Sequence, residues 1–175
     1  YTDSYNLSKK YSLTKDKDGA KIEIGSGSSL FKHYFSDITS TDIKTHEHND
    51  MSLDAQNMTN IDDNSIETFY AINCFHHFPN PDKFFSELNR TLKVGGTCVI
   101  IEPYYGMLSS FLYKRMFETE SFDKNQKDWN YISNGPMMGA NQALSYVVFF
   151  RDLNEFLSKN PNLEIVHTTI LNNYL

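Results

Sequence analysis

The stretch KIEIGSGSSL, residues 21–30, places two glycines and three serines directly after a short β-branched run. Residues 21–24 predict a buried strand, and residues 28–35 predict a helix that begins behind serine caps. A glycine turn between them lets the backbone lie in contact with a ligand, because a Cβ atom there would collide with it. The order of strand, glycine turn and helix therefore predicts an α/β fold with a ligand at this turn.

Composition restricts the class of protein. The chain has 175 residues, of which 39% are hydrophobic, and this suffices for a single domain over residues 1–175 without a metal or disulfide framework. Cys74 and Cys98 lie inside apolar runs, as reduced thiols of a cytoplasmic protein do. A formal net charge of −6 argues against a nucleic-acid partner. No run approaches the ~18 apolar residues of a membrane span, so we expect neither a membrane partner nor a secretion signal.

Further strands and helices alternate along the chain. Residues 80–96 predict the clearest helix, capped by Asn80, with Pro81 at its first position and glycines at its end. Such alternation implies right-handed βαβ units, that is, a doubly wound, mainly parallel sheet with helices on both faces. The chain starts without methionine, and we expect that it lacks its first residues and a final antiparallel strand. The further strands are expected at 37–43, 50–55, 66–75, 97–103 and 162–171.

The region 104–160 is too long for a simple crossover between strands. It combines a helical stretch at 104–117, a polar loop at 123–139, an apolar run at 143–150 and a last helix near 152–160. We interpret it as a helical lid over the crevice at the carboxyl ends of the strands, and residues 20–103 as the ligand-binding core. Most aromatic side chains of the lid are expected to pack it onto the sheet.

Acidic residues stand at the predicted ends of further strands. Asp42 closes the second strand, where a carboxylate accepts hydrogen bonds from the two hydroxyls of a ribose. Asp54 and Ala55 follow the third strand, where a carboxylate accepts from an exocyclic amine such as that of adenine, with Ile43 and Met58 as apolar walls. A glycine turn by itself is equally typical of purely structural turns. Together, these strand ends indicate a site for an adenosine-shaped ligand.

This ordered set of motifs resembles the class I S-adenosylmethionine-dependent methyltransferases, in particular the small-molecule, type 11-like group. The resemblance covers residues 20–103 and includes EIGSG at 23–27, LDAQNM at 53–58 and LKVGG at 92–96. It implies a Rossmann-like fold that binds S-adenosylmethionine and releases S-adenosylhomocysteine. The sequence departs from the family at Ser29, where a third glycine is common, and in the missing final strand.

The resemblance also implies the role of each motif residue. Glu23 and the turn Gly25–Ser26–Gly27 would surround the methionine end of the cofactor. Asp42 would bind the ribose, with Ile43 beside it, and Asn73 the amino acid moiety. The adenine would lie at the remaining two positions, Asp54 and Ala55.

Few catalytic residues are expected, because a sulfonium already activates its methyl group. His76 and His77 follow the fourth predicted strand, where an imidazole could deprotonate a hydroxyl or amine acceptor. Neighbouring residues of a strand point to opposite sides, so we expect one of them at the site. A half-buried histidine bonded to backbone is the favoured alternative. The HEH run at 46–48 is expected to be a solvated loop, and no metal site is predicted.

Three functions fit this pattern. The first is transfer of a methyl group from S-adenosylmethionine to a small molecule, sugar-like or apolar. The second is a non-catalytic adenosyl-binding partner subunit with the same pocket. The third is a nicotinamide-dependent oxidoreductase, but that fingerprint needs a third glycine where this chain has Leu30.

Overall fold

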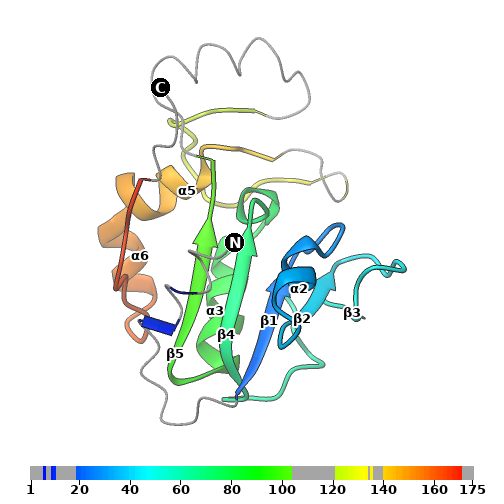
Figure 1. Ribbon diagram of the computed structural model, residues 1–175. Coiled ribbons are helices and arrows are strands. Elements are labelled where there is room, and N and C mark those ends of the chain that lie inside the picture. Colours follow the sequence, from blue (N-terminus) through cyan, green and yellow to red (C-terminus); the bar gives the residue numbers. More distant parts are fainter. Residues whose placement is uncertain are drawn as a thin grey trace.

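The fold is a sheet of five strands in the order β3-β2-β1-β4-β5, and all four pairings are parallel (Figure 1). The computed structural model describes residues 6, 9–10, 19–103, 121–133, 135 and 140–170. The predicted parallel α/β sheet is therefore confirmed. Its strands are β1 (Ala20–Ile24), β2 (Thr39–Asp42), β3 (Met51–Ser52), β4 (Ile66–Ile72) and β5 (Leu92–Ile101).

Helices cover both faces of the sheet, as predicted (Figure 1). Because successive side chains of a strand point to opposite faces, Phe69 of β4 packs in the core on the side of α3, whereas Tyr70 packs against Phe31 of α2 and Ile38. The helical elements are α2 (Leu30–Tyr34), the 3₁₀ helix η1 (Phe75–His77), α3 (Pro81–Thr91), α5 (Leu144–Tyr146), the π-helix η2 (Val147–Arg151) and α6 (Leu153–Lys159).

Helix α3 begins as predicted and ends earlier. The Asn80 side chain accepts a hydrogen bond from the Lys83 amide at 3.0 Å, and Pro81 occupies the first turn. The helix ends at Thr91, so the expected extent of 80–96 is wrong at its end. The pair Gly95 and Gly96 lies in β5, which begins at Leu92 opposite Ile66 of β4. These glycines serve an irregularity of the β4–β5 pairing, where a Cβ on Gly96 would lie 2.9 Å from the Lys93 carbonyl oxygen.

Strand β4 also ends earlier than the sequence predicts. It stops at Ile72, not at residue 75, because Asn73 adopts the left-handed conformation with φ of 54°. The Asn73 amide still donates to the Ile101 carbonyl of β5 at 2.7 Å. The chain then turns into η1, which carries the two histidines. This early turn places their side chains on a helical segment and not on a strand.

The predicted strand at 162–171 is wrong for the residues that the structure describes. Residues 163–170 form neither a helix nor a strand, and most of them are exposed, with Val166 at 48%. A strand needs a hydrogen-bonding neighbour, and no described residue pairs with this segment. The predicted helix at 104–117 lies outside the described residues, and the region 104–160 is described only from residue 121 onward.

No helix in the described part of the chain is both long enough and apolar enough to cross a membrane.

Candidate functional site

The glycine turn is hydrogen-bonded to the end of the neighbouring strand. The Ser26 amide donates to the Thr41 carbonyl at 2.9 Å, and the Gly27 amide donates to Asp42 Oδ2 at 3.1 Å. Because β1 and β2 are parallel neighbours, their carboxyl ends lie at the same edge of the sheet. The structure therefore brings the predicted turn and the predicted ribose-binding carboxylate into direct contact.

The two glycines of the turn differ in what a side chain would meet. Gly25 has φ of 65°, and a Cβ atom there would lie 2.8 Å from the Cys74 Cβ atom. Gly27 has φ of 52°, and a Cβ atom there would meet no described atom within 4 Å. Gly25 is thus required by packing within the protein. Gly27 presents bare backbone to open space, which is what the predicted ligand contact needs.

Glu23 is a buried carboxyl group at the end of β1. Glu23 is 4% exposed, and its Oε2 atom has no hydrogen-bond partner among the described residues. Burial disfavours the charged form and raises the pKa of Glu23 to about 7. A buried, unsatisfied carboxyl oxygen costs free energy unless a ligand supplies its partner. Glu23 therefore suits a ligand that carries a hydrogen-bond donor or a positive charge.

The predicted adenine residues follow β3 in a tight turn. Asp54 Oδ1 accepts from the Gln56 amide at 2.9 Å, and Ile43 is 48% exposed after β2. Ala55 and Met58 are buried in the main core. The Met58 side chain therefore packs inside the protein, and its place beside the adenine stays a prediction.

Helix α3 fixes the segment that follows β3. Glu87 Oε2 accepts from the Met58 amide at 2.7 Å, and Arg90 donates to the carbonyl oxygens of Met58 and Ile61 at 2.8 and 2.9 Å. Arg90 also pairs with Glu87 and Asp63, and these partners raise its pKa. The backbone groups of this turn are thus satisfied by side chains of one helix.

His76 forms a buried pair with Glu102, which follows β5. The Nδ1 atom of His76 lies 2.5 Å from Glu102 Oε2, and the two side chains are 2% and 4% exposed. Glu102 Oε1 accepts from the Phe75 amide at 2.8 Å. A carboxylate that accepts at both oxygens requires a proton on His76 Nδ1, which leaves the lone pair of the neutral imidazole on Nε2. In this tautomer a histidine can act as a general base.

The expectation that His76 and His77 point to opposite sides is wrong. Both residues lie on η1, and their ring centroids are 4.2 Å apart. His76 is buried and bonded to a carboxylate, whereas His77 is half-buried. Glu102 was not among the predicted site residues, and the sequence did not reveal its contact with His76. The position of Glu102 directly after β5 could have indicated this contact, because β5 neighbours β4 and the ends of neighbouring parallel strands lie close together.

Acidic side chains of the site contribute to the raised pKa of one buried thiol, Cys74. Burial raises the pKa of Cys74 well above its usual range, and the negative charges of Glu102, Glu23 and Asp42 add to this shift. Burial also raises the pKa of Cys98 to about 12. Both cysteines therefore stay protonated, as expected of core thiols. Cys74 Sγ donates to the Ile24 carbonyl oxygen at 3.2 Å, so this thiol lies against the end of β1.

The HEH loop does not form a metal centre in the described structure. His46 Nδ1 accepts from the His48 backbone amide at 3.2 Å, and the side-chain oxygen Oδ1 of Asn49 accepts from the His46 backbone amide. No group of three or more histidine, cysteine or carboxylate side chains in the described ranges could hold a metal ion.

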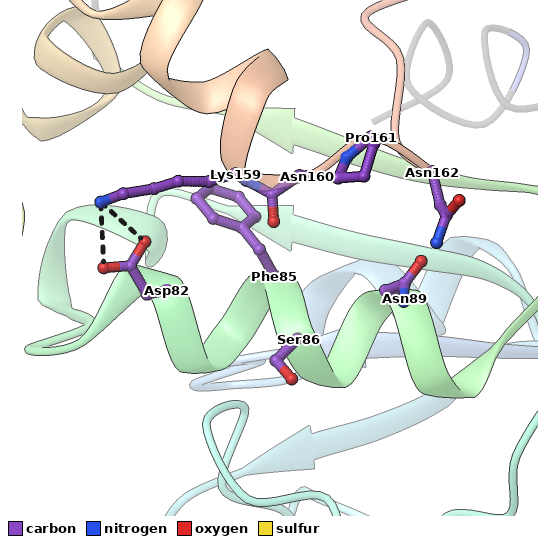
Figure 2. A pocket seen from close by; sticks show the side chains of 8 residues that line it. All are labelled: Asp82, Phe85, Ser86, Asn89, Lys159, Asn160, Pro161 and Asn162. Atoms are coloured by element: carbon purple, nitrogen blue, oxygen red, sulfur yellow. Dashed lines mark hydrogen bonds and ion pairs between the residues drawn. The ribbon is translucent and has the colours of Figure 1, made fainter.

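A separate cavity of about 370 Å³ lies between α3 and the turn after α6 (Figure 2). The ion pair between Asp82 and Lys159 closes one end, and Asn89 and Asn162 face each other at the other end. None of its lining residues belongs to the predicted site.

Comparisons with known proteins agree with this fold. Residues 22–100 match the family model of the methyltransferase domain, type 11. A protein from Anabaena variabilis, proposed to be a methyltransferase of an antibiotic biosynthesis pathway, shares 15% identity with a TM-score of 0.53. The match covers 91% of this chain and 61% of that chain. No protein of curated function matches in sequence.

Two further solved structures are similar. The CurJ carbon methyltransferase shares 14% identity with a TM-score of 0.51, over 85% of this chain and 42% of that chain. The trans-methyltransferase CalH, solved with SAH, shares 15% identity with a TM-score of 0.39, over 46% of this chain and 30% of that chain. The chain therefore spans less than two thirds of the length of each of these three structures.

Proposed function

We propose that this protein methylates a small-molecule acceptor with S-adenosylmethionine as the methyl donor, because residues 22–100 match the family model of the methyltransferase domain. The observation that carries the proposal is the open backbone at Gly27, with Asp42 bonded to its amide and Glu23 buried beside the same turn. In this proposal residues 20–103 bind the cofactor, and residues 104–160 cover the acceptor.

The residues at the strand ends suit the cofactor. S-adenosylmethionine supplies an activated methyl group on a sulfonium and also carries an ammonium group, a ribose and an adenine. Glu23 Oε2, which lacks a partner in the described structure, would accept from a cationic donor near the methionine end. Asp42 would bind the ribose hydroxyls while it keeps the Gly27 amide. Asn73 lies next to Cys74 at the end of β4, and Asp54 lies at the turn after β3.

The histidine and carboxylate pair supports a role in proton removal. Glu102 holds the Nδ1 proton of His76, so Nε2 would accept the proton of an attacking hydroxyl or amine. The resulting imidazolium is stabilised by the adjacent carboxylate, as a buried charge requires. The acceptor would therefore carry an O–H or N–H nucleophile, and a sugar-like or partly apolar molecule meets this condition.

Calorimetric titration with S-adenosylmethionine and its demethylated product tests the cofactor site. Asp42→Asn keeps an oxygen acceptor for Gly27 but removes the charge, so it should weaken binding by about tenfold to a hundredfold. Asp37→Asn is the matched control, because Asp37 pairs with Lys21 before β2 and should leave binding unchanged. Equal affinity of Asp42→Asn and the unmodified protein would place the ribose elsewhere.

Methyl transfer to a panel of hydroxyl and amine acceptors tests the reaction. His76→Asn should slow transfer while cofactor binding stays intact. A protein that binds the cofactor but transfers no methyl group to any acceptor of the panel would support the non-catalytic partner subunit instead.

A further inference from the structure

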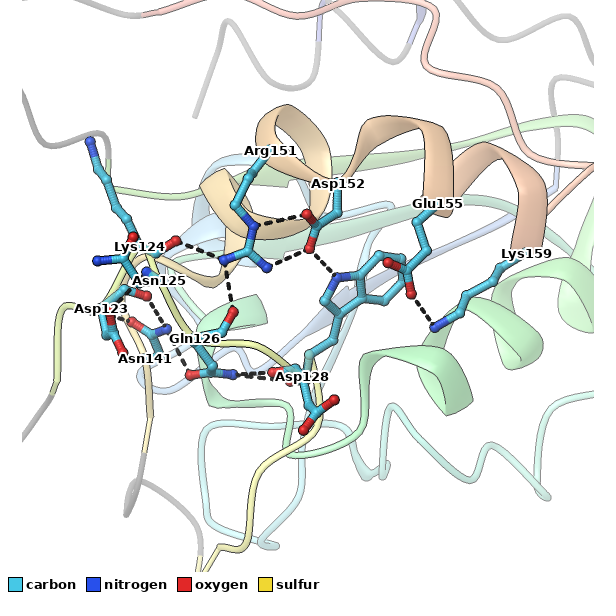
Figure 3. Close-up of polar contacts among 11 residues, drawn as sticks. Asp123, Lys124, Asn125, Gln126, Asp128, Asn141, Arg151, Asp152, Glu155 and Lys159 are labelled. Carbon is cyan, nitrogen blue, oxygen red and sulfur yellow. Dashed lines mark hydrogen bonds and ion pairs between the residues drawn. The ribbon is translucent and has the colours of Figure 1, made fainter.

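We propose that residues 121–131 form a strap that holds the histidine turn in place, with Tyr131 as its positioning residue. This inference rests on the proposed role of His76 and adds the element that orients it. The strap contains no helix, and the turn that it contacts is more than 50 residues away in sequence. Its conformation is set by side chains of the region 141–159 (Figure 3).

One end of the strap is fixed by Asn141, a residue with no solvent exposure. The side-chain nitrogen Nδ2 of Asn141 donates to the Asp123 carbonyl oxygen and to Gln126 Oε1, both at 2.8 Å. Its side-chain oxygen accepts from the Asp123 amide at 2.9 Å. Arg151 donates to the carbonyl oxygens of Lys124 and Gln126, both at 2.7 Å. A segment without regular structure needs such partners for its backbone groups.

The middle of the strap is anchored by Trp129, which is 3% exposed. Its indole nitrogen donates to Asp152 Oδ2 at 2.9 Å, and its ring meets Phe85 of α3 edge-on. The ammonium group of Lys159 lies over the same ring, 4.3 Å from its centroid. Trp129 therefore connects the strap to α6 and to the core through apolar, cation–π and hydrogen-bond contacts at once.

The other end of the strap contacts the histidine turn. The Tyr131 amide donates to the Pro79 carbonyl at 3.0 Å, and its hydroxyl donates to the His76 carbonyl at 3.3 Å. Glu102 contacts the same turn through the Phe75 amide and the His76 ring. The turn is thus held by Glu102 from the sheet and by Tyr131 from the strap. Since η1 is a single 3₁₀ turn, these contacts decide its orientation.

The variant Tyr131→Phe removes the hydroxyl and keeps the ring. Hydrogen exchange at the amides of Phe75, His77 and Phe78, which are hydrogen-bonded in this turn, should become about two- to tenfold faster. The ¹⁵N spectrum of the imidazole should show a loss of the single Nδ1–H tautomer of His76. Tyr34→Phe is the matched control, because Tyr34 is 68% exposed on α2 and should change neither signal.

If Tyr131→Phe left both the amide hydrogen exchange of the turn and the imidazole spectrum unchanged, the proposed role of the strap would be overturned. Trp129→Phe provides a second test, because it breaks the bond to Asp152 and should produce the same changes with Tyr131 intact. Both measurements use the cofactor-free chain and need no acceptor. Failure of methyl transfer therefore overturns the proposed function, whereas failure of these signals overturns the strap.

Discussion

Glu23 shows how a single residue can act against the stability of the fold. It lies in the buried carboxyl-terminal half of β1, and its Oε2 atom has no hydrogen-bond partner in the described structure. Burial raises its pKa, because loss of contact with water disfavours the charged carboxylate. In the proposed function the cofactor supplies the missing partner, whereas an apolar side chain would pack there at lower cost.

Glu23 makes stability depend on pH in a defined window. The folded-state pKa of about 7 exceeds the ordinary value of 4.5 for a glutamate, so the folded protein binds the proton more tightly and loses stability as pH rises between these values. Glu23→Gln should remove this loss. Urea unfolding should show the variant gaining on the order of 1–3 kcal/mol relative to the unmodified protein between pH 5 and pH 8. Glu47→Gln, in an exposed loop, is the control. A gain that does not change with pH would contradict the assignment.

Ser29 governs how the next element begins. The residue stands where the resembling family often has a third glycine, and it adopts φ of 55°, in the left-handed region. It occupies the cap position of α2 without a side-chain bond to the helix, so the predicted serine cap is wrong. Its hydroxyl instead lies 3.2 Å from that of Ser26. Ser29 thus adopts a backbone conformation that glycine adopts more readily than serine.

Ser29→Gly should therefore stabilise the protein. A left-handed conformation costs about 1–2 kcal/mol for a residue with a Cβ atom, and the lost hydroxyl contact offsets part of this. We expect a net gain of about 1 kcal/mol in the free energy of unfolding, measured with urea. Ser28→Gly, one residue earlier and without a positive φ, should bring no gain. An equal effect of the two variants would show that the conformation of Ser29 is not strained.

At the level of elements, the sequence predicts those parts that local chemistry decides. Asn80 and Pro81 define the start of α3 through contacts within one turn, and this start was predicted correctly. The end of α3 depends on β5, whose residues from Leu92 onward pair with β4. A pairing across 26 residues competes with the helix there, and glycines serve a sheet irregularity as readily as a helix end.

For the candidate site, the order of strand ends could be predicted and the contacts between side chains could not. The glycine turn and Asp42 lie together because parallel neighbouring strands place their ends together. The pair of His76 with Glu102 depends on the left-handed Asn73, which ends β4 early and rotates the histidines onto η1. No periodicity in the sequence reports that conformation.

At the scale of the whole molecule, the region after β5 was the least predictable. Trp129 and Asn141 are buried by partners from several elements, so their packing follows from the assembled fold. The strand expected at 162–171 has suitable residues, but none of the described residues pairs with 163–170. Composition indicates that a segment can form a strand, whereas the neighbouring chain decides whether it does.

The parallel arrangement of the sheet also has a consequence for how the chain reaches its native state. Ile22 of β1 lies opposite Thr39 on one side and Phe69 on the other, so the central strand is complete only after a long loop closes. Pairings of this range make folding slow, on the order of milliseconds to seconds. Pulse labelling during refolding should protect the Gly27 amide no earlier than the amides of β4. During synthesis, the nascent turn should remain open until the ribosome has delivered Cys74, whose side chain packs beneath Gly25.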